Sequence, residues 1–111
     1  MPILKFRAAA FRDLAAIASY IGQESGSSAV AASVAEKVIA HCERISALSI
    51  PIGRPRPELR SGYRSVTFGN YVIFMRYTDE DAPRSHIYIS NIIHGRRDLA
   101  AYFAANPAGD G

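Results

Sequence analysis

The spacing of hydrophobic residues changes from a period of two to a helical period near the start of this chain. Residues Ile3–Arg7 alternate between two faces, which predicts a short strand. The apolar positions that follow recur at helical spacing and predict an amphipathic helix over Ala10–Gln23. These positions are Phe11, Leu14, Ile17, Ala18 and Ile21.

A second helix is predicted after a short polar break. The segment Glu24–Ser28 contains Gly26, which suits a helix C-cap, and serines that suit the next N-cap. A second apolar stripe then predicts a helix over Ala29–Leu48. This stripe consists of Val34, Val38, Ile45 and Leu48. Because the break is short, we expect the two helices to form an antiparallel hairpin.

The second half of the chain follows the two-residue period of strands. Three prolines in Ile50–Pro57 prevent the helix from continuing. Two alternating segments, Tyr63–Phe68 and Tyr71–Thr78, flank a two-residue hairpin signal at Gly69–Asn70. The run His86–Ile93 is almost continuously apolar, which is typical of a central strand.

The remaining segments complete a predicted order of β-α-α-β-β-β-α. Asp79–Pro83 is predicted to be a polar turn, and Arg97–Ala105 a short last helix. The order predicts an α+β fold in which the helical hairpin packs on a mainly antiparallel sheet. We expect residues 1–105 to form one domain and residues 106–111 a flexible tail.

Composition excludes several classes of site. The single cysteine, Cys42, cannot form an intramolecular disulfide, and three dispersed histidines show no metal-ligand spacing. The glycines mark the ends of elements and form no phosphate-binding loop, so no cofactor is expected. The N-terminus lacks a signal-peptide pattern, and no run approaches the ~20 apolar residues of a membrane span. We therefore expect a cytoplasmic protein without a membrane partner.

Arginines are concentrated in the predicted sheet region. The net charge is only +3, yet the chain has eleven arginines and two lysines. Five of the arginines and one acid, Glu58, lie between Ile50 and Thr78. The five are Arg54, Arg56, Arg60, Arg64 and Arg76. Because guanidinium groups bind carboxylate or phosphate in a two-pronged manner, this region is expected to meet an anionic partner.

Arg64 and Arg76 are expected to neighbour one another across the predicted hairpin. Like charges placed opposite each other disfavour a sheet unless a carboxylate or a ligand lies between them. Glu58 is the internal candidate for that carboxylate.

Several segments together carry a family resemblance. They are Asp13–Leu14 with Tyr20–Ile21, Gly53–Pro55, Glu58–Arg60, Gly62–Ser65, Tyr71–Phe74 with Arg76–Tyr77, and His94–Asp98. In this order and spacing they resemble the ParE branch of the RelE/ParE superfamily of small bacterial toxins. Met75 departs from the pattern, since the family often has tyrosine there.

The resemblance implies a toxin of a type II toxin–antitoxin pair. ParE proteins are known for poisoning DNA gyrase, so we expect a non-catalytic gyrase inhibitor that a ParD-like antitoxin neutralises. Sequence-specific binding to nucleic acid is not expected. One alternative is an inactive toxin-like subunit that acts only within an autorepressor complex.

The other alternative is a RelE-type messenger RNA endoribonuclease, because the two activities share a fold. Metal-independent RNA cleavage requires an acid, a base and cations around the phosphate. The candidates for these roles are Arg60, Arg64, Arg76, His94, Arg97 and Tyr102. His94 is the attractive acid or base among them, because histidine titrates near pH ~6.5.

Two interaction surfaces are predicted. The antitoxin should bind a groove beside the helical hairpin and extend over the sheet, although some residues of the apolar stripe must face the core. Its candidates are Leu14, Ile17, Ala18, Ile21, Val34 and Val38, with Arg54, Arg56, Arg60, Arg64 and Arg76. The target should bind the C-terminal segment, through His94, Arg96, Arg97, Tyr102 and Phe103.

The C-terminal segment has a competing interpretation. Leu99, Tyr102 and Phe103 are also suited to anchoring the last helix to the core. Asp98 is interpreted as a charge at the N-terminus of that helix or as a salt-bridge partner, in preference to a catalytic base.

Overall fold

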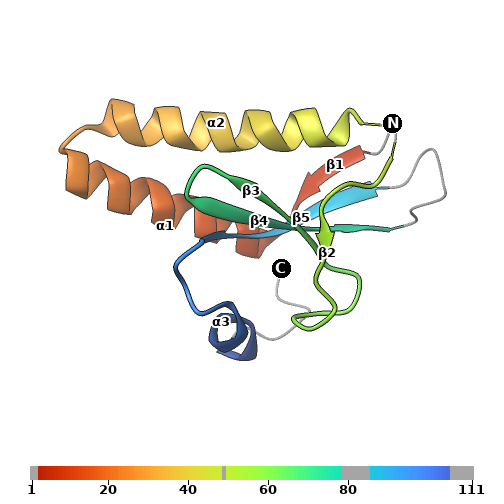
Figure 1. Cartoon of the computed structure of the whole chain (residues 1–111). Coiled ribbons are helices and arrows are strands. Elements are labelled where there is room, and N and C mark those ends of the chain that lie inside the picture. The colour runs from red at the N-terminus through yellow and green to blue at the C-terminus, as the bar shows by residue number, and fades with distance from the viewer. Residues whose placement is uncertain (1–2, 49, 79–85, 106–111) are drawn as a thin grey trace.

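The structure, a computed structural model, describes residues 3–48, 50–78 and 86–105. The elements are β1 (Ile3–Phe6), α1 (Ala8–Ser25), α2 (Ser28–Ser46), β2 (Arg54–Pro55), β3 (Arg64–Phe68), β4 (Tyr71–Tyr77), β5 (His86–His94) and α3 (Leu99–Ala105). Figure 1 shows the α1–α2 hairpin on one side of the sheet and α3 on the other. The predicted α+β order is thus confirmed. The predicted turn at Asp79–Pro83 and the tail 106–111 lie outside the described residues.

The sheet has the strand order β1-β5-β4-β3-β2. Strands β1 and β5 are parallel, and the other neighbours are antiparallel. Strand β5 is therefore internal, as its apolar sequence predicts. The two-residue strand β2 was not predicted, because its segment is proline-rich. Proline is compatible with this position because β2 is an edge strand.

The helix caps follow the chemistry of the break between α1 and α2. Gly26 ends α1 in the left-handed conformation with φ of 68°, and the side chain of Ser27 accepts a hydrogen bond from the backbone N–H of Val30. Both caps confirm the sequence analysis. The helix ends differ from the predicted ones by a few residues, since α1 runs to Ser25, α2 ends at Ser46 and α3 begins at Leu99.

The sheet separates a large core from a smaller one. On the hairpin side, α1 and α2 pack against alternate residues of β4 and β5, including Ile73, Met75 and Ile92. On the opposite side, Phe74 and Ile93 pack against Phe103 of α3. Because both faces of β5 are covered, its sequence has no polar face, apart from the polar pair Ser90 and Asn91.

The register of the β3–β4 hairpin corrects one prediction. Phe68 pairs with Tyr71, which leaves Gly69–Asn70 as the expected two-residue loop. Arg64, however, pairs with Met75. Since neighbouring residues of a strand point to opposite faces, Arg64 and Arg76 do not face one another. The predicted contact between these two arginines is therefore wrong.

Strand β5 contains an irregularity that shapes the functional region. Its pairing with β4 passes from Met75↔Ile89 to Phe74↔Asn91, so Ser90 is the extra residue. Its pairing with β1 ends at Ile89, where the backbone N–H of Arg7 also donates to the Ile89 carbonyl. Beyond this point the edge of β5 lies beside α1.

The hairpin of helices extends past the sheet (Figure 1). Side chains near its far end consequently lack a sheet surface to pack against. Tyr20 is 63% exposed and Val30 is 45% exposed. These two apolar side chains mark a surface that the described core does not use.

We predict that Phe103 anchors α3 without supporting the larger core. Phe103 is the buried residue of α3 and meets Phe74 with ring centroids 5.0 Å apart. Phe103→Ala should therefore release α3 and increase amide hydrogen exchange across residues 99–105, with little change in the centre of β4. The control is Tyr20→Ala, which removes an exposed aromatic ring. Unchanged exchange in α3 of Phe103→Ala contradicts the prediction.

Candidate functional site

The carboxylate of Asp13 joins three elements of the fold. Its Oδ2 atom accepts a hydrogen bond from the backbone N–H of Ile92 at 2.9 Å and from Asn91 Nδ2 at 3.4 Å. Its Oδ1 atom accepts from the hydroxyl of Tyr102 at 3.0 Å. Asn91 Nδ2 also donates to the Tyr102 oxygen at 3.2 Å. We call these residues the Asp13 network, which connects α1, β5 and α3.

The position of the network follows from the edge of β5. Strand β1 stops pairing before Ile92, so the Ile92 N–H needs a partner from another element. Helix α1 begins only two residues after β1 and brings Asp13 to this edge. An N–H bond to a carboxylate is stronger than one to a neutral acceptor. Asp13 thus replaces the missing strand neighbour.

Burial dominates the electrostatics of the network. Desolvation raises the pKa of Asp13 above its ordinary value, although the hydrogen bonds from Ile92, Tyr102 and Asn91 and the charge of Arg97 act in the opposite direction. Burial and the nearby Asp13 charge also raise the pKa of Tyr102. The Arg97 guanidinium carbon lies 5.1 Å from the centroid of the Tyr102 ring. Tyr102 of α3 therefore contacts both a partly buried acid, Asp13, and an exposed cation, Arg97.

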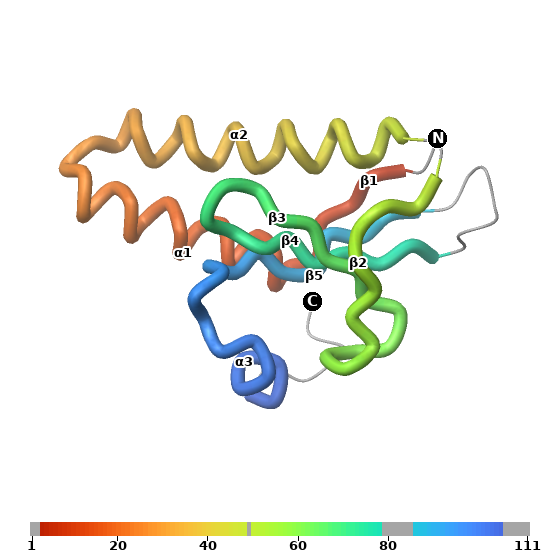
Figure 2. Tube along the Cα trace, in the orientation of Figure 1, coloured from red at the N-terminus to blue at the C-terminus, as the bar shows by residue number. Residues whose placement is uncertain are grey.

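A cavity of about 470 Å³ opens beside the Asp13 network. Its lining residues come mostly from α1, from the end of β5 and from the turn that follows. Figure 2 shows this turn leading from β5 to α3. Its lining includes Asp13, Ile17, Tyr20, Ile92, Arg96 and Arg97. We call it the α1–β5 groove. Its wall is largely apolar and its rim carries exposed arginines.

The predicted target-binding residues fall into two groups. His94 ends β5, and Arg96 and Arg97 lie in the turn that follows; all three are exposed. Tyr102 is half-buried and uses its hydroxyl within the Asp13 network. Phe103 is only 6% exposed, and its role in target binding stays a prediction. Its ring serves the smaller core, as the competing interpretation of the segment predicts.

The turn itself is ordered by local hydrogen bonds. Nδ1 of His94 accepts from the backbone N–H of Arg96 at 3.1 Å, and the His94 ring meets Tyr71 edge-on at 5.6 Å. Oδ1 of Asp98 accepts from the backbone N–H of Ala101 at 3.1 Å. Asp98 therefore caps the start of α3, which confirms the role predicted for it.

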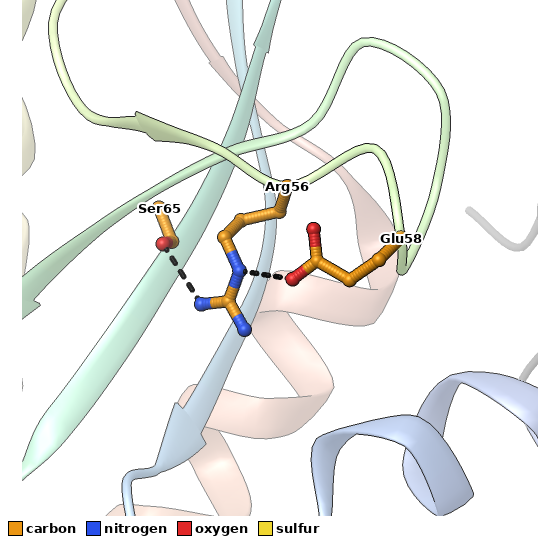
Figure 3. Close-up of polar contacts among 3 residues, drawn as sticks. All are labelled: Arg56, Glu58 and Ser65. Carbon is orange, nitrogen blue, oxygen red and sulfur yellow. Dashed lines mark hydrogen bonds and ion pairs between the residues drawn. The ribbon is translucent and has the colours of Figure 1, made fainter.

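Most arginines of the surface predicted to meet an anionic partner make internal contacts. Arg56 Nε donates to Glu58 Oε2 at 2.7 Å, and its guanidinium also donates to Ser65 Oγ at 3.2 Å (Figure 3). Arg64 donates to the carbonyl of Gly53 at 3.0 Å. The carboxyl of Glu58 is exposed, and its bond with Arg56 lowers its pKa. Glu58 thus pairs with Arg56 and does not separate Arg64 from Arg76.

Arg60 stabilises the C-terminal end of α3. Its guanidinium donates to the Phe103 carbonyl at 3.3 Å and to the Tyr63 hydroxyl at 3.2 Å. The guanidinium carbon also lies 4.7 Å from the centroid of the Phe103 ring. Among the five arginines, Arg54 and Arg76 are the exposed ones. The sequence showed where the five arginines cluster, but it did not indicate which of them bond to groups within the fold.

The predicted antitoxin residues on the helices also divide by burial. Leu14 and Val38 are 7% and 0% exposed and belong to the larger core, so their contact with an antitoxin stays a prediction. Ile17, Ala18, Ile21 and Val34 are half-buried. Sequence reasoning missed Tyr20 as a surface residue, although its spacing from Ile17 places both on one helical face. It also missed the role of Asp13, whose signal is a lone acid beside an apolar stripe.

A metal site, a reactive thiol and a membrane-spanning helix find little support in the described ranges. No group of three or more His, Cys, Asp or Glu side chains suited to a metal ion occurs in them. Burial raises the pKa of the Cys42 thiol to about 12, which keeps it protonated and unreactive. None of the helices within residues 3–48, 50–78 and 86–105 has the length and apolar character needed to cross a membrane.

The raised pKa of Asp13 predicts a pH-dependent contribution to stability. Because the folded protein binds the Asp13 proton more readily than the unfolded chain, this contribution is complete below the unfolded pKa, near 3.8, and is lost as pH rises through the folded pKa. The unfolding free energy of the wild type should therefore increase relative to Asp13→Asn as pH falls from 7 to about 4. Urea denaturation of both proteins across this range measures the difference. A difference that shrinks on acidification contradicts the prediction.

Comparison with known proteins places the chain in a family. The family model described as the ParE toxin of type II toxin–antitoxin system, parDE, matches residues 4–99. A search of curated proteins found no match. The chain is also similar to a solved structure from the chromosomal ParDE toxin–antitoxin system of P. aeruginosa, with a TM-score of 0.71, 21% identity, and coverage of 85% of this chain and 96% of that chain. That structural likeness shows a shared fold, and the family match over most of the sequence shows that the chain belongs to the ParE toxin family of type II toxin–antitoxin systems.

Proposed function

We propose that this toxin inhibits DNA gyrase by binding it, and that a ParD-like antitoxin neutralises the toxin. Membership of the ParE family supports both parts of the proposal. The observation that supports inhibition by binding, without catalysis, is that the candidate catalytic groups form hydrogen bonds within the fold. The Tyr102 hydroxyl donates to Asp13, and Arg60 is bound to the end of α3. Groups committed in this way are poorly placed to act on an RNA phosphate.

The exposed turn His94–Asp98 is the proposed gyrase-binding surface. Arginine is among the residue types that commonly dominate interfaces, and Arg96 and Arg97 are exposed here. The turn is held at both ends, by the Asp13 network and by the Asp98 cap. An ordered loop loses less conformational entropy on binding than a mobile one. These features suit a surface that acts by recognition.

The proposed antitoxin surface consists of the half-buried apolar residues of the helical hairpin together with exposed arginines. Ile17, Ala18, Ile21 and Val34 offer partly accessible apolar area. Arg54 and Arg76 offer exposed charges for acidic residues of the antitoxin. Antitoxins that fold on binding lay an amphipathic segment over such a surface.

RelE-type ribonuclease activity is the second candidate, and one observation favours it. His94 is exposed beside the Tyr71 ring and precedes two arginines, and within the described residues its Nδ1 atom is the ring nitrogen that accepts a backbone hydrogen bond. Its Nε2 atom is thus open to proton transfer, with cations nearby for a phosphate. The two candidates are separated by assays of the purified protein on both substrates.

We predict that the wild-type toxin traps gyrase-dependent DNA breaks and leaves RNA intact. Arg96→Ala and Arg97→Ala should each weaken gyrase inhibition by at least about tenfold, since hot-spot residues contribute about 2 kcal/mol or more. Lys37→Ala, which removes an exposed charge from α2, is the matched control. RNA cleavage by the wild type that is abolished in a well-folded His94→Ala variant instead supports the ribonuclease.

We predict that the sheet arginines divide into binding and structural groups. Arg54→Ala and Arg76→Ala should weaken antitoxin affinity by up to about fivefold, because exposed ion pairs contribute about 0–1 kcal/mol. Arg60→Ala should instead lower the free energy of unfolding by about 1–3 kcal/mol, because it removes charged hydrogen bonds to Phe103 and Tyr63. Calorimetric titration with the cognate antitoxin and urea denaturation measure the two effects. Equal behaviour of all three variants in both assays contradicts the division.

A further inference from the structure

The smaller core beneath α3 covers only part of its face of the sheet. Its members come from β4, the end of β5, α3 and the loop before β3. Among the described residues, none of its members comes from β1 or from the start of β5. The side chains that these two strand segments present on the α3 side are therefore outside both cores.

The sheet register places two cations beside one aromatic ring in this region. Lys5 of β1 pairs with Tyr88 of β5, and Tyr88 pairs in turn with Arg76 of β4. The residues on either side of each of these three pack into the larger core, on the hairpin side of the sheet. Because side chains alternate between the two faces of a strand, this row points to the α3 side. Both cations are exposed.

Arg7 adds a third cation to the row. Its guanidinium carbon lies 4.5 Å from the centroid of the Tyr88 ring, a contact that holds the planar cation in place. Within residues 3–48, 50–78 and 86–105, none of the three cations forms an ion pair with a carboxylate. We call Lys5, Arg7, Arg76 and Tyr88 the basic face.

We propose that the basic face binds the phosphate backbone of duplex DNA without reading its sequence, and that it does so on the DNA held by gyrase. The second part rests on the proposed function, whereas DNA binding by the toxin alone does not. Contacts from lysine and arginine to phosphates supply affinity but carry no sequence information. The inference is therefore compatible with the expected lack of sequence-specific binding.

The contacts of the Tyr88 ring favour the backbone of a duplex over the bases of a single strand. Proteins that bind single strands offer open aromatic rings on which bases stack. The Tyr88 ring is instead covered by the Arg7 guanidinium, and the His86 ring lies nearly parallel to it at 18°, with centroids 5.9 Å apart. In a duplex the bases stack on one another and the phosphates form the outer surface, which suits a face made of cations.

The spacing of the cations favours a polymer with repeated negative charges. Lys5 and Arg7 are two residues apart along the chain, which corresponds to about 6.6 Å in an extended segment. Lys5 and Arg76 lie on either side of β5, so their backbones are about 9.6 Å apart. A phosphate backbone can meet all three cations at once, whereas a single carboxylate cannot.

The basic face and the proposed gyrase-binding turn lie toward different ends of β5. Tyr88 and His94 are six residues apart in this strand, which corresponds to about 20 Å. The toxin can therefore contact gyrase through the turn and DNA through the basic face at the same time. Arg76 also belongs to the proposed antitoxin surface, so the antitoxin should compete with DNA for this residue.

The first experiment uses the two lysines of the chain as a matched pair. Lys5→Ala removes a charge from the basic face, and Lys37→Ala removes the same charge from an exposed site on α2. Three phosphate contacts weaken duplex binding about 40-fold between 50 and 200 mM salt, and two contacts weaken it about 12-fold. We expect the larger factor for the wild type and Lys37→Ala, and the smaller one for Lys5→Ala and for Arg76→Ala. Fluorescence anisotropy of a labelled mixed-sequence duplex measures these factors.

Two results of this titration overturn the assignment. One is an equal salt dependence of Lys5→Ala and Lys37→Ala, which would show that the binding reflects net charge alone. The other is tighter binding of a single-stranded oligonucleotide or of polyglutamate than of the duplex at equal salt, which would assign the basic face to a different occupant.

The second experiment adds gyrase. Bound DNA should raise the affinity of the toxin for gyrase about tenfold or more, because millimolar effective concentration acts on a non-specific Kd of about 10⁻⁴ M. The gain should shrink when Lys5→Ala and Arg76→Ala are combined and should persist in Lys37→Ala. Gyrase inhibition by a wild type that binds no DNA overturns this inference alone. Failure of the wild type to bind gyrase overturns the proposed function, and the salt titration then decides DNA binding by itself.

Discussion

The hydrogen bond from the Ile92 N–H to the Asp13 carboxylate is the contact on which the arrangement of this toxin depends. Strand β1 is too short to cover the far end of β5, and the irregularity at Ser90 shifts the register there. Without Asp13, a strand that is buried on both faces would leave its edge N–H unsatisfied, which costs about 1–3 kcal/mol. The same carboxylate accepts from Tyr102, and so the contact that closes the sheet edge also fixes the C-terminal helix.

This arrangement places the α1–β5 groove and the turn proposed to bind gyrase beside the Asp13 network. The helical hairpin covers one face of the sheet and α3 the other (Figure 1). The Asp13 network joins them around the edge of β5. The α1–β5 groove and the exposed arginine turn adjoin this junction. Burial raises the pKa of Asp13, because removing the charged carboxylate from water costs free energy. The hydrogen bonds of the network offset part of this cost. The Asp13 carboxylate nevertheless positions neighbouring elements, among them the segment proposed to bind gyrase.

The sequence predicted the order of the elements and the tight turn at Gly69–Asn70, because periodicity and turn chemistry are local properties. It could not predict features that depend on how elements meet. The register that separates Arg64 from Arg76 and the internal engagement of Arg60 arise from pairing across the sheet. The helical stripe did not distinguish the buried Leu14 and Val38 from the half-buried Ile17 and Ile21, since the hairpin extends beyond the sheet. Asp13 stood in a recognised motif, but its partners are 78 and 89 residues away in sequence.

A double-mutant cycle between Asp13 and Tyr102 tests the central claim most directly. The quantity measured is the concentration of toxin that halves gyrase supercoiling, for wild type, Asp13→Ala, Tyr102→Phe and the double variant, with the unfolding free energy of each as a parallel readout. If the Asp13 network positions the target-binding turn, the single substitutions share one effect, and the double variant is little worse than either, with a coupling energy of about 0.5–3 kcal/mol. Strictly additive losses, or inhibition that none of the substitutions changes, would contradict the account.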